Sequence, residues 1–131
     1  MLSNSVITTI LQVRDGSAAV EFYRDRLGLP YRGQNTEGQE LFSVGAASLA
    51  LMPGPDATPT GRTELSFEVA DVVAEIRDLE ERGVTFADYD LPGLKTVEHV
   101  CVLGSEKAAW FEDPDGNVLC LHEVLPQGTT S

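Results

Sequence analysis

Hydrophobic and polar residues recur in the same order in two halves of the chain. Around Val13 the sequence reads VRDGSAAVEFYRDRLGL, and around Val69 it reads VADVVAEIRDLEERGV. In each, an alternating stretch passes through Val-X-Asp into helical spacing and then reaches a glycine and a β-forming run. Asp15 and Asp71 lie 56 positions apart, and Gly28 and Gly83 lie 55 apart, so one deletion aligns the copies. A repeat of this length predicts two related structural modules.

Each copy contains one predicted amphipathic helix. Asp15 and Asp71 are the expected N-caps, and Gly28 and Gly83 end the two helices in a left-handed conformation. Apolar residues then recur at three- and four-residue spacing, which predicts a buried stripe on each helix. These stripes are Ala19, Phe22, Tyr23 and Leu27 in the first helix, and Val72, Ile76 and Leu79 in the second. On the exposed side of the second helix we expect an ion pair between Arg77 and Glu81.

Short β-type runs follow each helix, separated by turn residues. Strands are predicted near 31–34, 40–44, 48–52, Thr85, 108–112 and 118–123, with an irregular segment at 88–104 and a hairpin turn at 113–117. With the strand that leads into each helix, both modules read β-α-β-β-β. We therefore predict an α+β protein with a single domain over 1–131, made of module 1 (about 5–53), linker 54–62 and module 2 (about 63–125).

Side chains alternate between the two faces of a strand, which separates the core residues from the rest. If the helices cover one face of each sheet, Leu11 and Val13 face the first helix, and Leu119 and Leu121 face the second. The opposite face is unusually polar for a sheet. It carries Thr8, Ile10, Gln12, Glu64, Ser66, Glu68, Val118, Cys120 and His122.

The amino-acid composition limits which classes of molecule this protein can bind. The net charge is −12, and residues 64–123 hold 15 acids against 4 bases, so a nucleic-acid partner is excluded. No apolar run approaches the ~18 residues of a membrane span, and no signal peptide is visible, so we expect a cytoplasmic protein with no membrane partner. Cys101 and Cys120 are predicted to be free thiols.

The repeated helix segment and the stretch WFEDPDGNVLCLHE together resemble the vicinal oxygen chelate superfamily, which includes glyoxalase I, bleomycin resistance proteins and extradiol dioxygenases. The resemblance covers about residues 5–125. It implies two tandem βαβββ modules forming a half-open mixed-sheet barrel around a ligand cavity, in a homodimer. Metal-dependent members carry ligands at four equivalent strand positions. In this sequence those positions hold Thr8, Ala50, Glu64 and Cys120.

Only two of these four residues could bind a metal, and a catalytic ion commonly has three protein ligands. We therefore expect no metal or other cofactor. An alternative is a substitute zinc site formed by Glu64, Cys120 and His122. His99, in the irregular segment, is expected to be an exposed loop residue.

The favoured interpretation is a metal-independent small-molecule-binding protein. Its expected ligand-binding residues are Gln12, Met52, Glu64, Glu68, Trp110, Cys120 and His122. Trp110, together with Tyr31, Phe42 and Tyr89, suits a planar or aromatic ligand. The alternative is a lyase, isomerase or dioxygenase of the same superfamily that uses a noncanonical metal site or Glu64 as catalytic base. A third interpretation is an interaction module whose concavity is filled by side chains.

Overall fold

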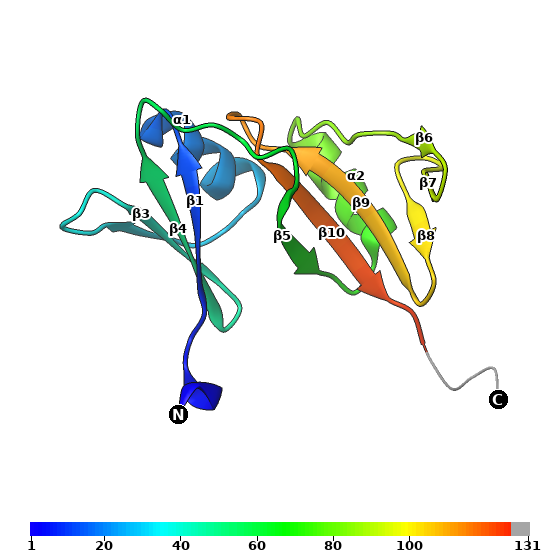
Figure 1. Cartoon of the computed structure of the whole chain (residues 1–131), viewed down its shortest axis with the longest axis horizontal. Helices are drawn as coiled ribbons and strands as arrows, with labels where there is room; N and C mark the ends of the chain where they lie inside the picture. The colour runs from blue at the N-terminus through cyan, green and yellow to red at the C-terminus, as the bar shows by residue number, and fades with distance from the viewer. Residues whose placement is uncertain (127–131) are drawn as a thin grey trace. The chain divides into compact units, whose positions relative to one another are not determined.

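The first half of the chain forms a four-stranded mixed sheet with one helix against it, in a computed structural model that describes residues 1–126 (Figure 1). After a 3-10 turn (η1, Leu2–Asn4), the elements are β1 (Thr8–Val13), α1 (Gly16–Glu21), a π-helical turn (η2, Phe22–Arg26), β2 (Tyr31–Gln34), β3 (Glu40–Val44) and β4 (Ala47–Pro53). The strand order is β1-β4-β3-β2, with β1 and β4 parallel and the other pairs antiparallel.

The second half repeats this topology. Its elements are β5 (Thr63–Glu68), α2 (Val72–Glu81), β6 (Asp90–Leu91), β7 (Leu94–Lys95), β8 (Cys101–Leu103), β9 (Glu106–Glu112) and β10 (Val118–Val124). The strand order is β5-β10-β9-β8, and β5 and β10 are parallel. Figure 1 shows α2 running along the back of β9 and β10. The predicted α+β class and the two βαβββ modules are confirmed.

Contacts divide the chain into two compact units. Unit 1 contains Met1–Thr60 together with Asp113–Gly116, and unit 2 contains Gly61–Glu112 and the described residues from Asn117 onward. The Asp113–Gly116 turn joins β9 to β10, but its carboxylates accept hydrogen bonds from residues in the first half of the chain. Tyr23 Oη donates to Asp113 Oδ2 at 2.7 Å, and the Arg14 amide donates to Asp115 Oδ1 at 2.9 Å. The sequence identified this segment only as a turn, and its role in unit 1 is visible only in the structure.

The two predicted N-caps form as expected. Asp15 Oδ1 accepts from the amides of Ser17 and Ala18, and Asp71 Oδ1 accepts from the Ala74 amide. These three bonds satisfy amide groups that have no partner within the helix. The first helix differs from its prediction, because its α-helical part ends at Glu21 and the chain then widens into η2. Residue periodicity does not distinguish one wide turn from a regular one.

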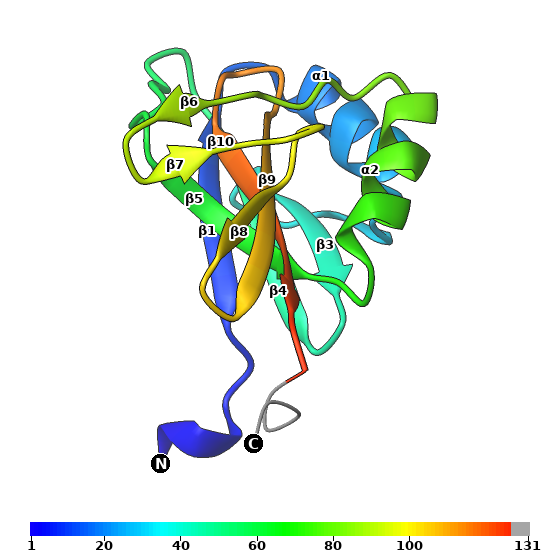
Figure 2. The same ribbon diagram turned by 90° about the vertical axis from the view of Figure 1, so that its right-hand side faces the viewer.

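Two predictions in module 2 are wrong. The strand expected near Thr85 is only an isolated bridge between Phe86 and Phe111. The segment 88–104, expected to be irregular, contains β6, β7 and β8. Seen from the side in Figure 2, β6 and β7 form a small hairpin, and the chain after β7 turns back to enter β8. Strands of two or three residues are too short to show the alternation on which such predictions depend.

The core of each unit lies between its helix and its sheet. Leu11 and Val13 are buried whereas Ile10 and Gln12 are exposed, which confirms the faces predicted for β1. Leu119 and Leu121 of β10 are also buried, as is Cys120 between them. The side chains of α2 that contact its sheet are Val72, Ile76 and Leu79, all buried. Both cysteines are free, as predicted, and both are buried. No helix within residues 1–126 is long and apolar enough to cross a membrane.

Candidate functional site

The sheet of unit 2 has one face against α2 and one polar face. We call Ser66, Glu68, Trp110, Cys120 and His122 the unit 2 face. Strand register aligns these residues in two rows, because Cys120 pairs with both Ser66 and Trp110, and His122 pairs with Glu68. Directly paired residues point their side chains to the same side of a sheet. Four residues predicted to bind ligand, Glu68, Trp110, Cys120 and His122, therefore share one face.

A chain of polar contacts links Ser66 and Glu68 on β5 through His122 on β10. Ser66 Oγ and His122 Nδ1 share a hydrogen bond of 2.6 Å, and His122 Nε2 lies 3.7 Å from Glu68 Oε1. A carboxylate beside Nε2 favours the tautomer with the proton on Nε2, so Nδ1 accepts from the Ser66 hydroxyl. The His122 side chain is 23% exposed and that of Glu68 is 70% exposed. The imidazole is thus oriented while its edge and the Glu68 carboxylate stay accessible to a ligand.

Trp110 and Cys120 form the apolar part of the face. Trp110 is half-buried, and the ring of Tyr89 meets it edge-on with centroids 5.6 Å apart. This contact places Tyr89, from the segment between α2 and β6, beside the indole on the unit 2 face. Cys120 is buried, and its Sγ donates to the Leu121 carbonyl oxygen at 3.3 Å. Burial raises the pKa of the Cys120 thiol.

Glu64 lies beside this group in an irregular stretch of β5. The pairing with β10 runs from Val118–Thr63 directly to Leu119–Leu65, so Glu64 is an extra residue in the ladder. Such a bulge redirects side chains and often lies next to a functional site. Glu64 is half-buried. Simple alternation predicted it to be in line with Ser66 and Glu68, and the bulge is the feature that alternation could not reveal.

Unit 1 has its own exposed face, formed by β1 and β4. We call Thr8, Ile10, Gln12, Ala50 and Met52 the unit 1 face, in which Gln12 pairs with Met52 and Ile10 pairs with Ala50. Ile10 is 55% exposed and Met52 is 39% exposed, whereas Ala50 is buried. Gln12 and Met52, both predicted to bind ligand, are therefore neighbours on an accessible and mixed apolar–polar surface.

Two aromatic residues predicted to line the ligand cavity lie elsewhere. Phe42 is fully buried on the helix side of the unit 1 sheet, where its ring contacts Tyr23 and Tyr31. The Tyr31 hydroxyl donates to the buried Glu40 carboxylate, and this bond raises the pKa of Tyr31. The prediction was wrong because β3 places Phe42 in register with Leu49, a core residue. Aromatic type alone does not reveal which face a strand residue occupies.

The metal positions implied by the resemblance do not fit a metal ion. Ala50 provides no donor atom, and the Cys120 thiol is buried with a raised pKa, which disfavours the thiolate that binds metal. The substitute set of Glu64, Cys120 and His122 is also a poor match, because Nδ1 of His122 is bonded to Ser66 and Nε2 faces Glu68. Among residues 1–126, no three His, Cys, Asp or Glu side chains come together as candidate ligands.

Ser66 lies on this face but is not among the residues that the sequence predicted to bind ligand. The alternation had placed Ser66 on the polar face, but a serine between two glutamates carries no distinctive signal. Its importance comes from the register of β5 against β10, which brings Ser66 to the imidazole of a residue 56 positions away. No local pattern in the sequence encodes that pairing.

Known proteins are similar to this chain in sequence and in fold. The model of the Glyoxalase/Bleomycin resistance protein/Dioxygenase superfamily matches residues 5–121 of this chain. The uncharacterized protein YraH of Bacillus subtilis (strain 168) is 28% identical over 129 residues, which cover 88% of this chain and 94% of YraH.

Two solved structures are similar along nearly their whole length. TnmS3, an antibiotic binding protein from Streptomyces sp. CB03234, is 25% identical with a TM-score of 0.69, covering 95% of this chain and 98% of TnmS3. A superfamily member from Sphaerobacter thermophilus DSM 20745 is also 25% identical, with a TM-score of 0.74 and coverage of 94% of this chain and 99% of that protein.

Proposed function

Because this chain belongs to the Glyoxalase/Bleomycin resistance protein/Dioxygenase superfamily, we propose that it is a small-molecule-binding protein that holds its ligand without a metal ion. The observation that carries the proposal is the Ser66–His122–Glu68 chain beside Trp110 on one sheet face. An oriented imidazole, a hydroxyl, a carboxylate and an aromatic surface are the usual components of a small-molecule site. The similarity to an antibiotic binding protein supports the same class of function.

The composition of the unit 2 face favours a planar ligand with a positive charge. The Trp110 indole offers a flat apolar surface, on which a cation is also attracted to the ring electrons. Glu68 is exposed and anionic, and residues 64–123 carry a large excess of acids. On the unit 1 face, Gln12 and Met52 provide an amide and a polarisable apolar side chain. The shared inter-module cavity and the homodimer stay predictions from the sequence, and the proposal includes them.

We expect planar cations to raise the melting temperature and to lose affinity when the unit 2 face is altered. With 9-aminoacridine as probe, Trp110→Ala should weaken binding about 10- to 100-fold, and His122→Ala about 10-fold, from the loss of aromatic contact and of one hydrogen bond. Isothermal titration calorimetry measures both affinities. The anion 2-naphthoate should bind more weakly than the cation.

An exposed residue of α2 provides the control. Glu81→Ala removes a side chain from the helix on the other side of the unit 2 sheet, so 9-aminoacridine affinity should stay within about twofold of the wild type. Equal loss of affinity in the Glu81 and His122 variants would mean that the effect is general destabilisation. Absence of any stabilisation by planar cations or anions would contradict the proposed function.

Metal independence is tested separately. Protein purified without chelator should contain Zn, Mn, Fe and Ni at far below one equivalent, because the donor set described above is incomplete. Inductively coupled plasma mass spectrometry makes the measurement, and EDTA treatment should leave both the melting temperature and probe affinity unchanged. One equivalent of any of these metals, lost in Glu64→Ala or Cys120→Ala, would overturn this part of the proposal.

A further inference from the structure

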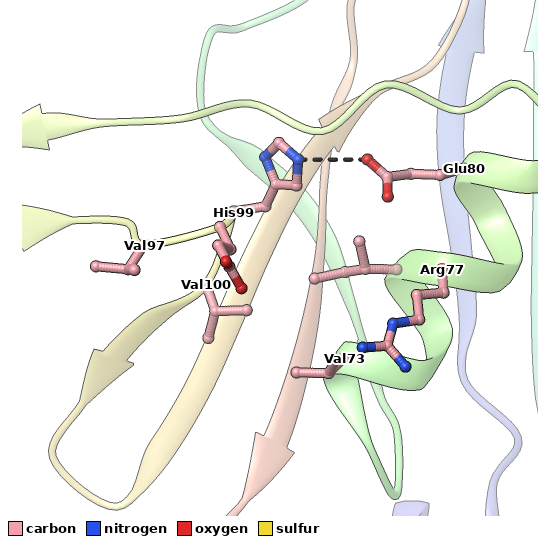
Figure 3. A pocket seen from close by; sticks show the side chains of 8 residues that line it. Val73, Arg77, Glu80, Val97, His99 and Val100 are labelled. Carbon is pink, nitrogen blue, oxygen red and sulfur yellow. Dashed lines mark ion pairs between the residues drawn. The ribbon is translucent and has the colours of Figure 1, made fainter.

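Unit 2 contains a half-open cavity of about 330 Å³ that is not part of the unit 2 face (Figure 3). One wall is α2, which contributes Val73, Ile76, Arg77 and Glu80, and the other wall is the turn at 97–100. Ligand pockets begin at about 300 Å³, so this volume suits a small metabolite and not an extended drug-sized molecule.

The floor of this cavity is apolar, and its apolar surface is partly open to solvent. Ile76 is only 5% exposed, whereas Val73 is 40% exposed and Val97 is 69% exposed. Figure 3 shows Val73 and Val100 facing the space between the helix and the turn. A short aliphatic group placed there would cover valine surface that is otherwise in water.

The turn wall has an unusual backbone. Glu98 and His99 both have positive φ, at 51° and 74°, and Val97 and Val100 form an antiparallel bridge across them. Two consecutive left-handed residues are typical of turns built from Asn and Gly, and each costs about 1 kcal/mol or more with a larger side chain. Strain of this kind often accompanies a functional site.

Contacts of His99 hold the turn in this conformation. Its amide donates to Asp88 Oδ1 at 3.1 Å, its Nδ1 lies 3.0 Å from Asp88 Oδ2, and its Nε2 lies 3.3 Å from Glu80 Oε2. Figure 3 shows the last of these contacts bridging from the turn to α2. His99, expected to be an exposed loop residue, is instead 28% exposed and fixed between two carboxylates. The cavity therefore has a rigid mouth.

Two opposite charges at the cavity have no partner among the described residues. The side chains of Arg77 on α2 and Glu98 on the turn form no hydrogen bond or ion pair within residues 1–126. The predicted pair between Arg77 and Glu81 does not form. Figure 3 shows the Arg77 guanidinium extended alongside Val73 instead. One cation and one anion are thus available on opposite walls of a pocket with a valine and isoleucine floor.

We propose that this cavity is a second binding site, for an aliphatic α-amino acid in its zwitterionic form. The ligand carboxylate pairs with the Arg77 guanidinium, which suits planar bidentate recognition, and the ligand ammonium pairs with Glu98. The aliphatic side chain covers Ile76, Val73 and Val100. The excess of acids in unit 2 disfavours a purely anionic ligand, and the valine and isoleucine floor favours an aliphatic amino acid over glycine.

The test is an NMR titration of the ¹⁵N-labelled full chain with L-leucine. We expect shifts of the Val97–Val100 and Val73–Glu80 amides. Two matched analogues separate the charges, since 4-methylpentanoate lacks the ammonium and 3-methylbutylamine lacks the carboxylate. Each should bind at least about 10-fold more weakly than leucine, the factor that corresponds to loss of one ion pair of about 1.4 kcal/mol.

Two substitutions then assign each charge to its residue. Arg77→Gln should weaken leucine about 10-fold and leave 3-methylbutylamine unchanged, whereas Glu98→Gln should weaken leucine and leave 4-methylpentanoate unchanged. Arg82→Gln and Glu81→Gln, outside the cavity on the same helix, are the charge-matched controls and should have no effect. Unshifted 97–100 amides, equal affinity for all three ligands, or unchanged leucine affinity in both cavity variants would overturn the proposal.

Discussion

Replacement of Asp113 by alanine is expected to lower the free energy of unfolding by about 3 kcal/mol, and the melting temperature by roughly 10 °C. Asp113 is buried, and it accepts from the hydroxyl of Tyr23, which has no exposed surface. Its other oxygen accepts from the Asp115 amide at 2.9 Å. The substitution therefore removes both of these bonds and leaves a buried hydroxyl without this acceptor, which costs more than the loss of an exposed bond of the same length. Urea denaturation followed by circular dichroism measures the change.

Two further variants separate the contributions to this effect. Tyr23→Phe removes only the hydroxyl, so it should cost about 1.5 kcal/mol. Asp115→Ala is the matched control in the same turn, because it removes one exposed bond to the Arg14 amide and should cost less than about 1 kcal/mol. If Asp113→Ala cost no more than Asp115→Ala, the buried contact with Tyr23 would not stabilise unit 1.

The second large effect is expected in the core of unit 2. Phe111→Ala should lower the free energy of unfolding by about 3–5 kcal/mol, because it removes a ring that is 1% exposed and leaves a cavity beneath α2. The ring of Phe86 lies 5.2 Å away, centroid to centroid, and would lose this contact. Differential scanning calorimetry and urea denaturation both measure the loss.

A conservative substitution at the same position provides the control. Phe111→Leu keeps most of the volume, so it should cost under about 1.5 kcal/mol. An alanine variant as stable as the leucine variant would show that the surrounding side chains collapse into the space. That result would mean that the α2 interface is loosely packed and not the main source of stability in unit 2.

Strand alternation allows stability and binding to be examined independently. Leu121 faces α2, whereas its neighbours Cys120 and His122 point to the other side of β10. Variants at Phe111 or Leu121 change the core, and variants at His122 or Trp110 change the polar face. The ligand experiment is therefore interpretable, since a residue needed for binding is not the residue that holds the helix.

Much of the fold was predictable because it depends on local patterns. Caps at Asp15 and Asp71, glycines at the helix ends, and apolar spacing all act within a few residues. The parallel pairs β1–β4 and β5–β10 follow once each module is recognised as β-α-β-β-β. The short strands β6, β7 and β8 were missed because their pairing is specified by turns and by β9, not by their own residues.

The candidate site was only partly predictable. The alternation of side chains along each strand predicted that Glu68, Cys120 and His122 share one face, and the strand register places them together. Alternation along a single strand could not predict the bulge at Glu64 or the burial of Phe42, because both depend on how one strand is aligned with the next. His99 was predicted to be an exposed loop residue, although its imidazole contacts Asp88 and Glu80 from two other segments.

The sequence alone determined the duplication, the identity of the helices, the alternation of the strands and the absence of suitable residues at two of the four metal positions. Each depends on residue type and on spacing along the chain. Only the tertiary structure decided that Ser66 meets His122, that Tyr23 bonds to Asp113 and that His99 joins a turn to α2. These contacts join residues 56, 90 and 19 positions apart, and their formation depends on register and packing that no local pattern specifies.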